Sequence, residues 1–515
     1  MSLGSIDHRL KFQFVFWFGV ISLAALFSGY FLAVNSLLVA IGIIGTVWMM
    51  TLPYHSKLSY VLAIATFNSA LIVPLFPGRP YFWEFAALLG WSGLMVTVFM
   101  RQYARDSGRV IKENRWLLIG VVGYCVVLVI TMFYRGVGLR ILGSEQMGGR
   151  FYFQQLTCSI FPLLFIMLRP SEKNLVRLLF WQCILTTTFL ISDFVLTKAP
   201  DALLFLLQFF ELSGDAVNFE MKAARFGIRR FQSFYVVSSG FFFLLLMKHN
   251  LTDFLTRKGS YLIPTLLLVI GVGLLSGHRY LSVVVVGVLT VSAYGERFFT
   301  LKNVAIGFCL TVFVIGFAYL TSDKLPLAAQ RTISFLPGID IDSQARIDAL
   351  GTLEVRRMLR KAGMELMPFY MWMGRGFGQE SQDYSWQWDP TTVTGHIEMG
   401  RFYNGFLGLM VNTGLAGTVF MLIFLTAGTW KAWVILQHIR IHGSTDDFTR
   451  VCKLLTGMWI ANTAAFLFLH GDSEYAMKTF SLQAGLLICC HEHLKARLAT
   501  AEPESPDDED PALVG

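Results

Sequence analysis

Long apolar runs recur along almost the whole chain, and they constrain its fold more than any other feature. A run of about 18 or more apolar residues can cross the roughly 30 Å hydrocarbon core of a membrane as a helix. Hydrophobic residues make up 55% of the chain and charged residues only 15%, whereas about a quarter of a soluble domain is charged. The sequence therefore predicts an all-α, polytopic integral membrane protein with about 12–14 transmembrane helices. The candidate spans lie at residues 13–32, 34–53, 58–76, 81–100, 115–133, 151–168, 176–196, 231–248, 260–276, 280–295, 303–320, 403–428, 453–470 and 475–491.

The spacing of these runs divides the chain into four parts. Residues 1–320 are expected to form spans joined by short loops, apart from an outer loop near 197–230. Residues 321–402 form a large loop, 403–492 the C-terminal spans, and 493–515 an acidic, disordered tail. The large loop is predicted to be partly helical, because apolar residues recur in it at helical steps. Its tryptophans favour an ordered cap on the membrane surface or over a cavity: Trp372, Trp386 and Trp388.

Basic residues in the short loops predict the orientation of the spans, since lysine and arginine are enriched in cytoplasmic loops. One loop is crowded with Arg101, Arg105, Arg109, Lys112 and Arg115 and is placed in the cytoplasm. Counting spans from it puts both termini in the cytoplasm and the two long segments outside. The first run lacks a small-residue cleavage site and is expected to be an uncleaved span.

Several kinds of site are not expected. The seven cysteines fall in or against apolar runs, so no disulfide framework is implied. Histidines on the predicted outer side are scattered and lack acidic neighbours at metal-ligand spacing, so neither a metal nor another cofactor is expected. The net charge of +8 is spread over many loops, which gives no footprint for a nucleic acid.

Arginines on the predicted outer side point to a phosphate-binding site. The segment "ARFGIRRF" carries Arg225, Arg229 and Arg230, and "LLSGHRYLSVV" places Arg279 in a tight turn between two apolar runs. A charge there is costly unless it has a function. The planar guanidinium group grips phosphate at two points, so converging arginines would bind a lipid-linked diphosphate. The alternative is that outer arginines reach lipid headgroups or pair with acids in the long loop, and this is favoured for Arg135 and Arg140.

A second group of polar residues stands just before the long apolar run at 403–428. His396 could act as a general base on a sugar hydroxyl, and Glu398 or Glu380 could do the same or orient the histidine. The alternative for His396 is an ordinary solvated loop histidine. Tyr403 and Asn404 could also serve only to anchor and cap the following helix.

Four motifs follow one another between about residues 225 and 425: an arginine-led span, a short turn, an arginine-bearing helix with a glycine turn, and a helix entered through an asparagine. In order they read "RRFQSFYVVSSGFFFLLL", "SGHRY", "SQARIDALGTLEVRRMLRKAGMELMPFYMWMGRGFGQ" and "YNGFLGLMVNTGLAG". Their order and spacing resemble the bacterial O-antigen ligase and polysaccharide polymerase superfamily. In that family the third motif opens a large periplasmic loop, and a histidine–asparagine pair closes it.

This resemblance implies a metal-independent, inverting glycosyltransferase in the bacterial inner membrane, with its active site on the periplasmic side. The implied donor is a glycan on undecaprenyl diphosphate, and the implied acceptor is a second glycan for a polymerase or lipid A–core for a ligase. A flippase and a chain-length regulator are implied partners. Arg225, Arg229, Arg230 and Arg279 would hold the diphosphate, helped by Arg346 or Arg357 from the loop helix.

One departure from the family pattern leaves the base open. The family has histidine directly before the asparagine, whereas this chain has Tyr403 before Asn404. His396 could fold back into that position, Tyr403 or Glu398 could be the base, or the arginines could suffice.

Other functions remain as rivals to the polymerase. An O-antigen ligase is the nearest alternative, and a protein-directed oligosaccharyltransferase is a third possible transferase. A transporter or flippase would be a different class, but no internal repeat is seen, and Glu84 and Asp193 lie near span ends. The last alternative is a membrane scaffold for polysaccharide synthesis that has itself lost activity.

Overall fold

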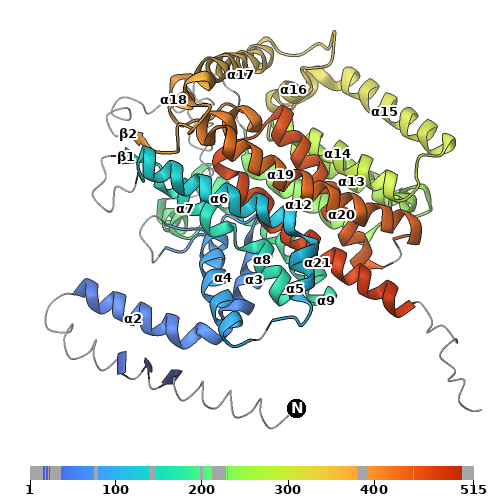
Figure 1. Cartoon of the computed structure of the whole chain (residues 1–515). Coiled ribbons are helices and arrows are strands. Elements are labelled where there is room, and N and C mark those ends of the chain that lie inside the picture. Colours follow the sequence, from blue (N-terminus) through green and yellow to red (C-terminus); the bar gives the residue numbers. More distant parts are fainter. Residues whose placement is uncertain are drawn as a thin grey trace, which may run out of the picture.

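The computed structural model shows a polytopic, all-α membrane protein, as the sequence predicts (Figure 1). It describes residues 16–17, 19–20, 22–23, 36–74, 79–101, 103–138, 146–197, 201–211, 228, 230–380, 393–444 and 446–501. The first half contains α2 (Ser36–Thr51), η1 (Leu52–Tyr54), α3 (His55–Thr66), α4 (Phe82–Phe99), α5 (Ser107–Glu113), α6 (Arg115–Arg135), β1 (Gln146–Met147), α7 (Gly149–Cys158), α8 (Phe161–Leu168), α9 (Glu172–Leu185), α10 (Thr188–Thr197), η3 (Asp201–Gln208) and α12 (Gln232–Lys248). The second half contains η4 (Leu251–Leu255), α13 (Gly259–Leu274), α14 (Tyr280–Gly295), α15 (Leu301–Thr321), η5 (Ser322–Lys324), α16 (Leu327–Ile333), α17 (Ser343–Tyr370), β2 (Gln379–Glu380), α18 (Val393–Glu398), α19 (Gly405–His442), α20 (Asp447–Ala464), η7 (Ala465–Leu469), η8 (Ser473–Tyr475) and α21 (Ala476–Ala501).

Among the described residues, seven helical stretches are long and apolar enough to cross a membrane, and three shorter apolar helices accompany them. Most of the candidate span at 13–32 lies outside the described residues. The run at 58–76 is not one helix as predicted, because α3 ends at Thr66 after 12 residues, or about 18 Å. The runs at 151–168 and 176–196 are each divided between two helices, α7 with α8 and α9 with α10. The helix α21 continues to Ala501, so the tail predicted from residue 493 begins in helix.

The bundle has two ends, which we call the cap face and the basic face. The cap face carries α16, α17 and α18, which lie together over the ends of the other helices in Figure 1. At the basic face, which includes the predicted basic loop that carries Arg109, ion pairs join the connections between helices. The pairs are Arg169–Asp106 (2.8 Å), Arg109–Glu492 (3.0 Å), Lys248–Asp447 (2.6 Å) and Arg497–Asp446 (3.0 Å).

Helix α19 runs from the cap face to the basic face and is broken at Gly414, where φ is +70° and ψ is −173°. The break leaves backbone groups free for the turn that follows α17. The amide of Leu415 donates to the carbonyl of Met371 at 2.6 Å, and the amide of Arg375 donates to the carbonyl of Val411 at 2.7 Å. From the other side, Thr131 of α6 donates to the carbonyl of Met373 at 3.2 Å. The turn at 371–376 is therefore held between α19 and α6: main-chain groups of α19 bind it on one side, and side chains of α6 bind its carbonyls on the other.

Helix α17 confirms the helix predicted in the large loop, but several of its large apolar residues face outward, although Leu359 is buried. Ile347 is 68% exposed and Leu350 58%, while the small residues Ala345 and Ala349 are buried. Gly363 is also buried, and an added Cβ there would lie 2.6 Å from the side chain of Leu407. Small residues thus let α17 approach α19 closely. Trp372, expected in an ordered cap, is 71% exposed, and Trp386 and Trp388 lie outside the described residues.

Helix α15 stands apart from the other spans at the edge of the bundle (Figure 1). None of its 21 residues is buried, although its mean hydropathy is that of a transmembrane helix. In a membrane, lipid chains would surround such a helix.

Candidate functional site

The turn between α13 and α14 carries Arg279 on the cap face. Gly277 adopts φ +73°, a conformation that glycine allows without strain, and so turns the chain between two helices within a few residues. Arg279 then donates from Nη2 to the hydroxyl of Ser334 at 2.8 Å and to the carbonyl of Arg331 at 3.3 Å. Both acceptors are uncharged, so the turn fixes this guanidinium without neutralising it.

Two further arginines meet the same turn. Arg331, from α16, donates to the carbonyl of Gly277 and to the hydroxyl of Thr352 at 2.8 Å. Arg331 and Arg230 both form ion pairs with one carboxylate, that of Asp348 in α17. Both arginines are buried. Two arginines thus share one carboxylate beside Arg279.

Arg356 of α17 completes the group. Its guanidinium lies over the ring of Tyr403, 5.5 Å from the ring centroid. Burial lowers the pKa of Arg356, and the positive charge of Arg331 lowers it further. Burial lowers the pKa of Arg279 too, with added effects from Arg331 and Arg356. Arginine stays protonated at neutral pH even so. We call Arg230, Arg279, Arg331 and Arg356 the arginine cluster.

Histidine and tyrosine side chains lie directly beside the arginine cluster. The hydroxyl of Tyr403 is 3.5 Å from Nε2 of His396. The ring of Tyr403 stacks on His470 with centroids 5.0 Å apart, and His470 meets the edge of Tyr280, the residue after Arg279, at 5.7 Å. Tyr403 has φ +49°, a strained conformation for a residue with a side chain. We call Tyr403, His396, His470 and Tyr280 the histidine–tyrosine cluster.

The loop that presents Tyr403 is fixed by buried polar contacts. Arg401 donates to the carboxylate of Glu474 at 2.6 Å, and Glu474 is buried. The side-chain amide of Asn412 donates to the carbonyl of Gly400 at 3.0 Å. The amide of Leu407 donates to the side chain of Asn404 at 2.9 Å, so Asn404 caps α19. These contacts tie both ends of the strained residue and hold its ring toward Arg356.

The structure brings together four of the residues predicted for the site: Arg230, Arg279, His396 and Tyr403. Glu398 is nearby in sequence, but its contact is through its carbonyl, which accepts from Arg375. Arg225 and Arg229 lie outside the described residues.

Two predicted phosphate ligands are placed elsewhere. Arg346 is exposed and donates to the carbonyl of Ile339 at 2.9 Å. The side chain of Arg357 is 81% exposed and pairs with Glu354 of its own helix. The expectation that Arg346 or Arg357 would join the other arginines is therefore wrong: Arg346 is exposed near the start of α17, and Arg357 is turned from Arg356 by about 100°, the rotation of one position along a helix. Arg356 takes the place that was assigned to Arg357.

Three members of the site were missed: Arg331, Arg356 and His470. Arg331 and Arg356 belong to the large loop, where sequence shows charge but not which side of a helix faces inward. His470 is one of the histidines expected on the outer side, and these were considered only as metal ligands. Its position directly after a span, on the same side as Tyr280, is the signal that could have found it.

A cavity of about 290 Å³ lies inside the bundle below the site. Its wall includes Tyr280 and Tyr235, whose rings are 6.1 Å apart, and otherwise consists mostly of apolar side chains. Polar groups at its surface include Asn462 and Lys478, and Lys478 Nζ lies 4.4 Å from the centre of the Trp83 ring.

Within the described residues, no group of three or more His, Cys, Asp or Glu side chains is arranged to hold a metal ion. Comparison with known proteins gives no match: neither a protein-family model nor a curated protein is recognisably similar to this chain.

Proposed function

We propose that the protein is a membrane glycosyltransferase that polymerises glycan carried on undecaprenyl diphosphate. The observation that supports this most is the arginine cluster. Two of its arginines, Arg230 and Arg331, pair with one carboxylate, that of Asp348. The other two, Arg279 and Arg356, have only uncharged partners among the described residues. Buried like charges repel one another, so an anion with several oxygens would be bound strongly there.

The reaction follows from what the two clusters offer. The oxygen of an acceptor hydroxyl forms a bond to the anomeric carbon of the donor, while the bond from that carbon to the diphosphate breaks. The electron pair of that bond stays on the diphosphate oxygen, where the arginine cluster stabilises the growing negative charge. The acceptor proton passes to His396 as general base, with Tyr403 orienting the imidazole. Attack opposite to the leaving group inverts the anomeric centre.

The identity of the acceptor separates the two transferase functions. A second lipid-linked glycan as acceptor makes the enzyme a polymerase, and lipid A–core as acceptor makes it an O-antigen ligase, the nearest alternative. By the basic connections, the basic face lies in the cytoplasm of a bacterial cell and the cap face in the periplasm. A flippase would deliver the donor to the cap face, and a chain-length regulator would set the product size.

A transporter of lipid-linked oligosaccharide is the second candidate, and the cavity inside the bundle favours it, because Lys478 and Asn462 give it polar groups within an apolar wall. The two functions differ in what they need. Transport needs two compartments, whereas glycan transfer proceeds in detergent. Protein purified in detergent and mixed with undecaprenyl-diphosphate glycan should lengthen the glycan chains, as seen on a gel ladder. A preparation that moves this lipid across vesicle membranes but yields no longer chains in detergent would favour transport.

The neighbouring arginines of α17 provide a matched pair of variants. Arg356→Gln is expected to lower the rate of chain elongation about 10- to 100-fold, because one charge-assisted contact to phosphate is worth about 1.5–3 kcal/mol. Arg357→Gln removes the same charge from the adjacent position but should leave the rate unchanged, since Arg357 is exposed. Rates would be measured at equal amounts of folded protein. Equal losses in both variants would contradict the placement of the diphosphate.

The contact between Tyr403 and His396 can be tested at the level of one hydroxyl. Tyr403→Phe keeps the ring under Arg356 and on His470 but removes the group that faces His396. We expect elongation to fall about tenfold with little change in the apparent KM for donor, as for a group that orients a base. His396→Gln should cost more, about 10²–10⁴-fold. A tenfold rise in KM without change in kcat for Tyr403→Phe would place the tyrosine in binding instead.

A further inference from the structure

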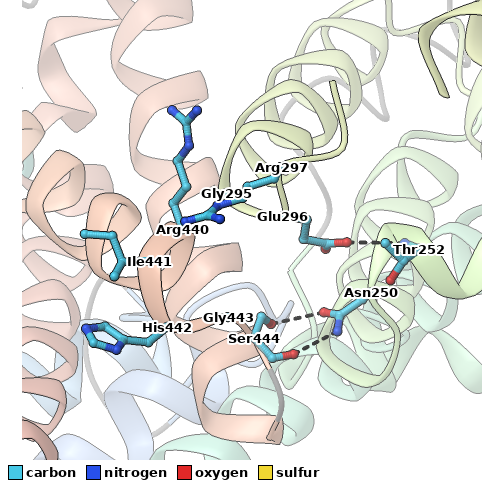
Figure 2. Close-up of a pocket in the computed structure, with 10 residues that line it drawn as sticks. All are labelled: Asn250, Thr252, Gly295, Glu296, Arg297, Arg440, Ile441, His442, Gly443 and Ser444. Carbon is cyan, nitrogen blue, oxygen red and sulfur yellow. Dashed lines mark hydrogen bonds between the residues drawn. The ribbon is translucent and has the colours of Figure 1, made fainter. Parts of the chain in front are cut away.

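A second site lies at the opposite end of the bundle. There a pocket of about 400 Å³ opens between the last residues of α14 and α19 and the segment between α12 and η4 (Figure 2). Tyr280, at the start of α14, belongs to the histidine–tyrosine cluster, and Gly295, at its end, lines this pocket. The 16 residues of α14 separate the two sites by about 24 Å. The pocket is therefore distinct from the proposed active site.

Two arginines from different parts of the chain line this pocket. Arg297 follows α14, and in Figure 2 its side chain extends toward α19, from which Arg440 projects. Among the described residues, neither guanidinium has a carboxylate within ion-pair distance. The carboxylate of Glu296 is already occupied: it pairs with Lys453 and accepts from the amide of Thr252 at 3.3 Å. The pocket therefore carries unneutralised positive charge.

Aromatic side chains hold Arg440 in position. Its guanidinium lies 4.2 Å from the centre of the Tyr294 ring. That ring stacks on Trp433 at 5.5 Å, and its hydroxyl accepts from Gln437 at 3.0 Å. A stacked arginine keeps the edge that carries its N–H groups free for an anion. The arrangement thus orders a cation beforehand, which reduces the entropy lost when a ligand binds.

We infer that this pocket binds a phosphate group, supplied by the headgroup of an acidic membrane phospholipid. Phosphate is the anion that two arginines bind best, because its oxygens accept from several N–H groups at once. A lipid is favoured over a soluble phosphate by the surroundings: Ile441 beside Arg440 is 65% exposed and Trp433 is 41% exposed. Exposed apolar and tryptophan side chains next to basic groups are typical of the membrane–water boundary.

The proposal is tested with the full-length protein in detergent by native mass spectrometry. The probes are phosphatidylglycerol, phosphatidylcholine as a neutral lipid, and inorganic phosphate. Arg297→Gln/Arg440→Gln is compared with the wild type and with Arg115→Gln. Arg115 is a matched control, because it also lies near an aromatic ring (Trp116, 5.6 Å) at the start of a span on the basic face, but outside the pocket.

The expected result is at least a tenfold lower occupancy of phosphatidylglycerol in the double variant, no change in Arg115→Gln, and no effect on phosphatidylcholine. If the double variant loses binding of inorganic phosphate but keeps that of phosphatidylglycerol, the pocket binds a soluble phosphate, and the lipid assignment is overturned. Equal phosphatidylglycerol occupancy in all three proteins would overturn the site altogether. Size-exclusion profiles and thermal midpoints in lipid-free detergent show whether the double variant is folded. They should match the wild type, because neither arginine loses an ion pair when it is replaced.

Discussion

Replacement of Arg279 by alanine should lower the rate of glycan transfer by about 10²–10³-fold, the loss typical when one preorganised donor to a developing negative charge is removed. Arg279 is held by Ser334 and by the carbonyl of Arg331, so it is ordered before substrate arrives. Its neighbours Arg331 and Arg356 add positive charge, so the three arginines would together stabilise the negative charge on a leaving diphosphate. The measurement is single-turnover transfer from undecaprenyl-diphosphate glycan in detergent.

The control for this prediction is Arg346→Ala on the same cap. Arg346 is exposed and its guanidinium contacts one backbone carbonyl, so this variant should transfer glycan at the wild-type rate. Arg279→Lys separates charge from shape: a partial recovery is expected, because lysine restores the charge but not the planar group that binds two oxygens. Wild-type transfer by folded Arg279→Ala would refute the assignment of the arginine cluster to the diphosphate.

Replacement of Gly414 by alanine is expected to have the largest effect on stability. With φ +70° and ψ −173°, Gly414 occupies a region that is open essentially to glycine only. That strain alone costs about 1–3 kcal/mol. An added Cβ would also lie 2.8 Å from the carbonyl oxygen of Trp372 and 2.9 Å from the amide nitrogen of Gly374, which are backbone atoms that cannot move aside. We expect a total loss of about 3 kcal/mol or more, with the turn at 371–376 displaced.

The stability of this variant would be followed as the apparent thermal midpoint in detergent, together with the fraction that stays monodisperse. Gly307→Ala in α15 is the matched control, because an added Cβ there meets nothing within 4 Å and the backbone is helical. That change should be neutral or slightly stabilising. Gly374→Ala, where the Cβ would lie 2.5 Å from the carbonyl oxygen of Asn412, should behave like Gly414→Ala. A wild-type midpoint for both Gly414→Ala and Gly374→Ala would show that the turn is not held at the break in α19.

The sequence predicts the class of fold well, because membrane spanning depends on the length and polarity of each run, and both can be read from residue types. It does less well where a span bends. The run at 58–76 looks continuous, yet α3 ends at Thr66, and bends of this kind depend on contacts with other helices. Gly414 is a similar case. A glycine within a helical run usually only lowers the stability of the helix, and the role of Gly414 is apparent only from the turn that binds at this position.

For the candidate site, the sequence identifies the kinds of residue but not always which of two neighbours takes part. Arg279 could be identified because a charge in a tight turn between two apolar runs is costly unless it has a function. Arg356 and Arg357 are equivalent in the sequence, and only the packing of α17 through Ala349 and Gly363 decides which one faces Tyr403. His396 and Tyr403 could be proposed together, but their contact depends on the conformation of Tyr403 at φ +49°.

The way the turn at 371–376 is held has a consequence for the order of events during synthesis. A chain is made and begins to fold from its N-terminus, so α6 and the turn exist before α19 does. The carbonyls of Met373 and Gly374 can reach Thr131 and Arg135 of α6 early, but the contacts with Val411, Asn412 and Leu415 must wait for α19. His470 and Glu474 are made later still. A ribosome-bound chain therefore carries its arginines without a complete site, and activity can begin only after the last spans have been inserted.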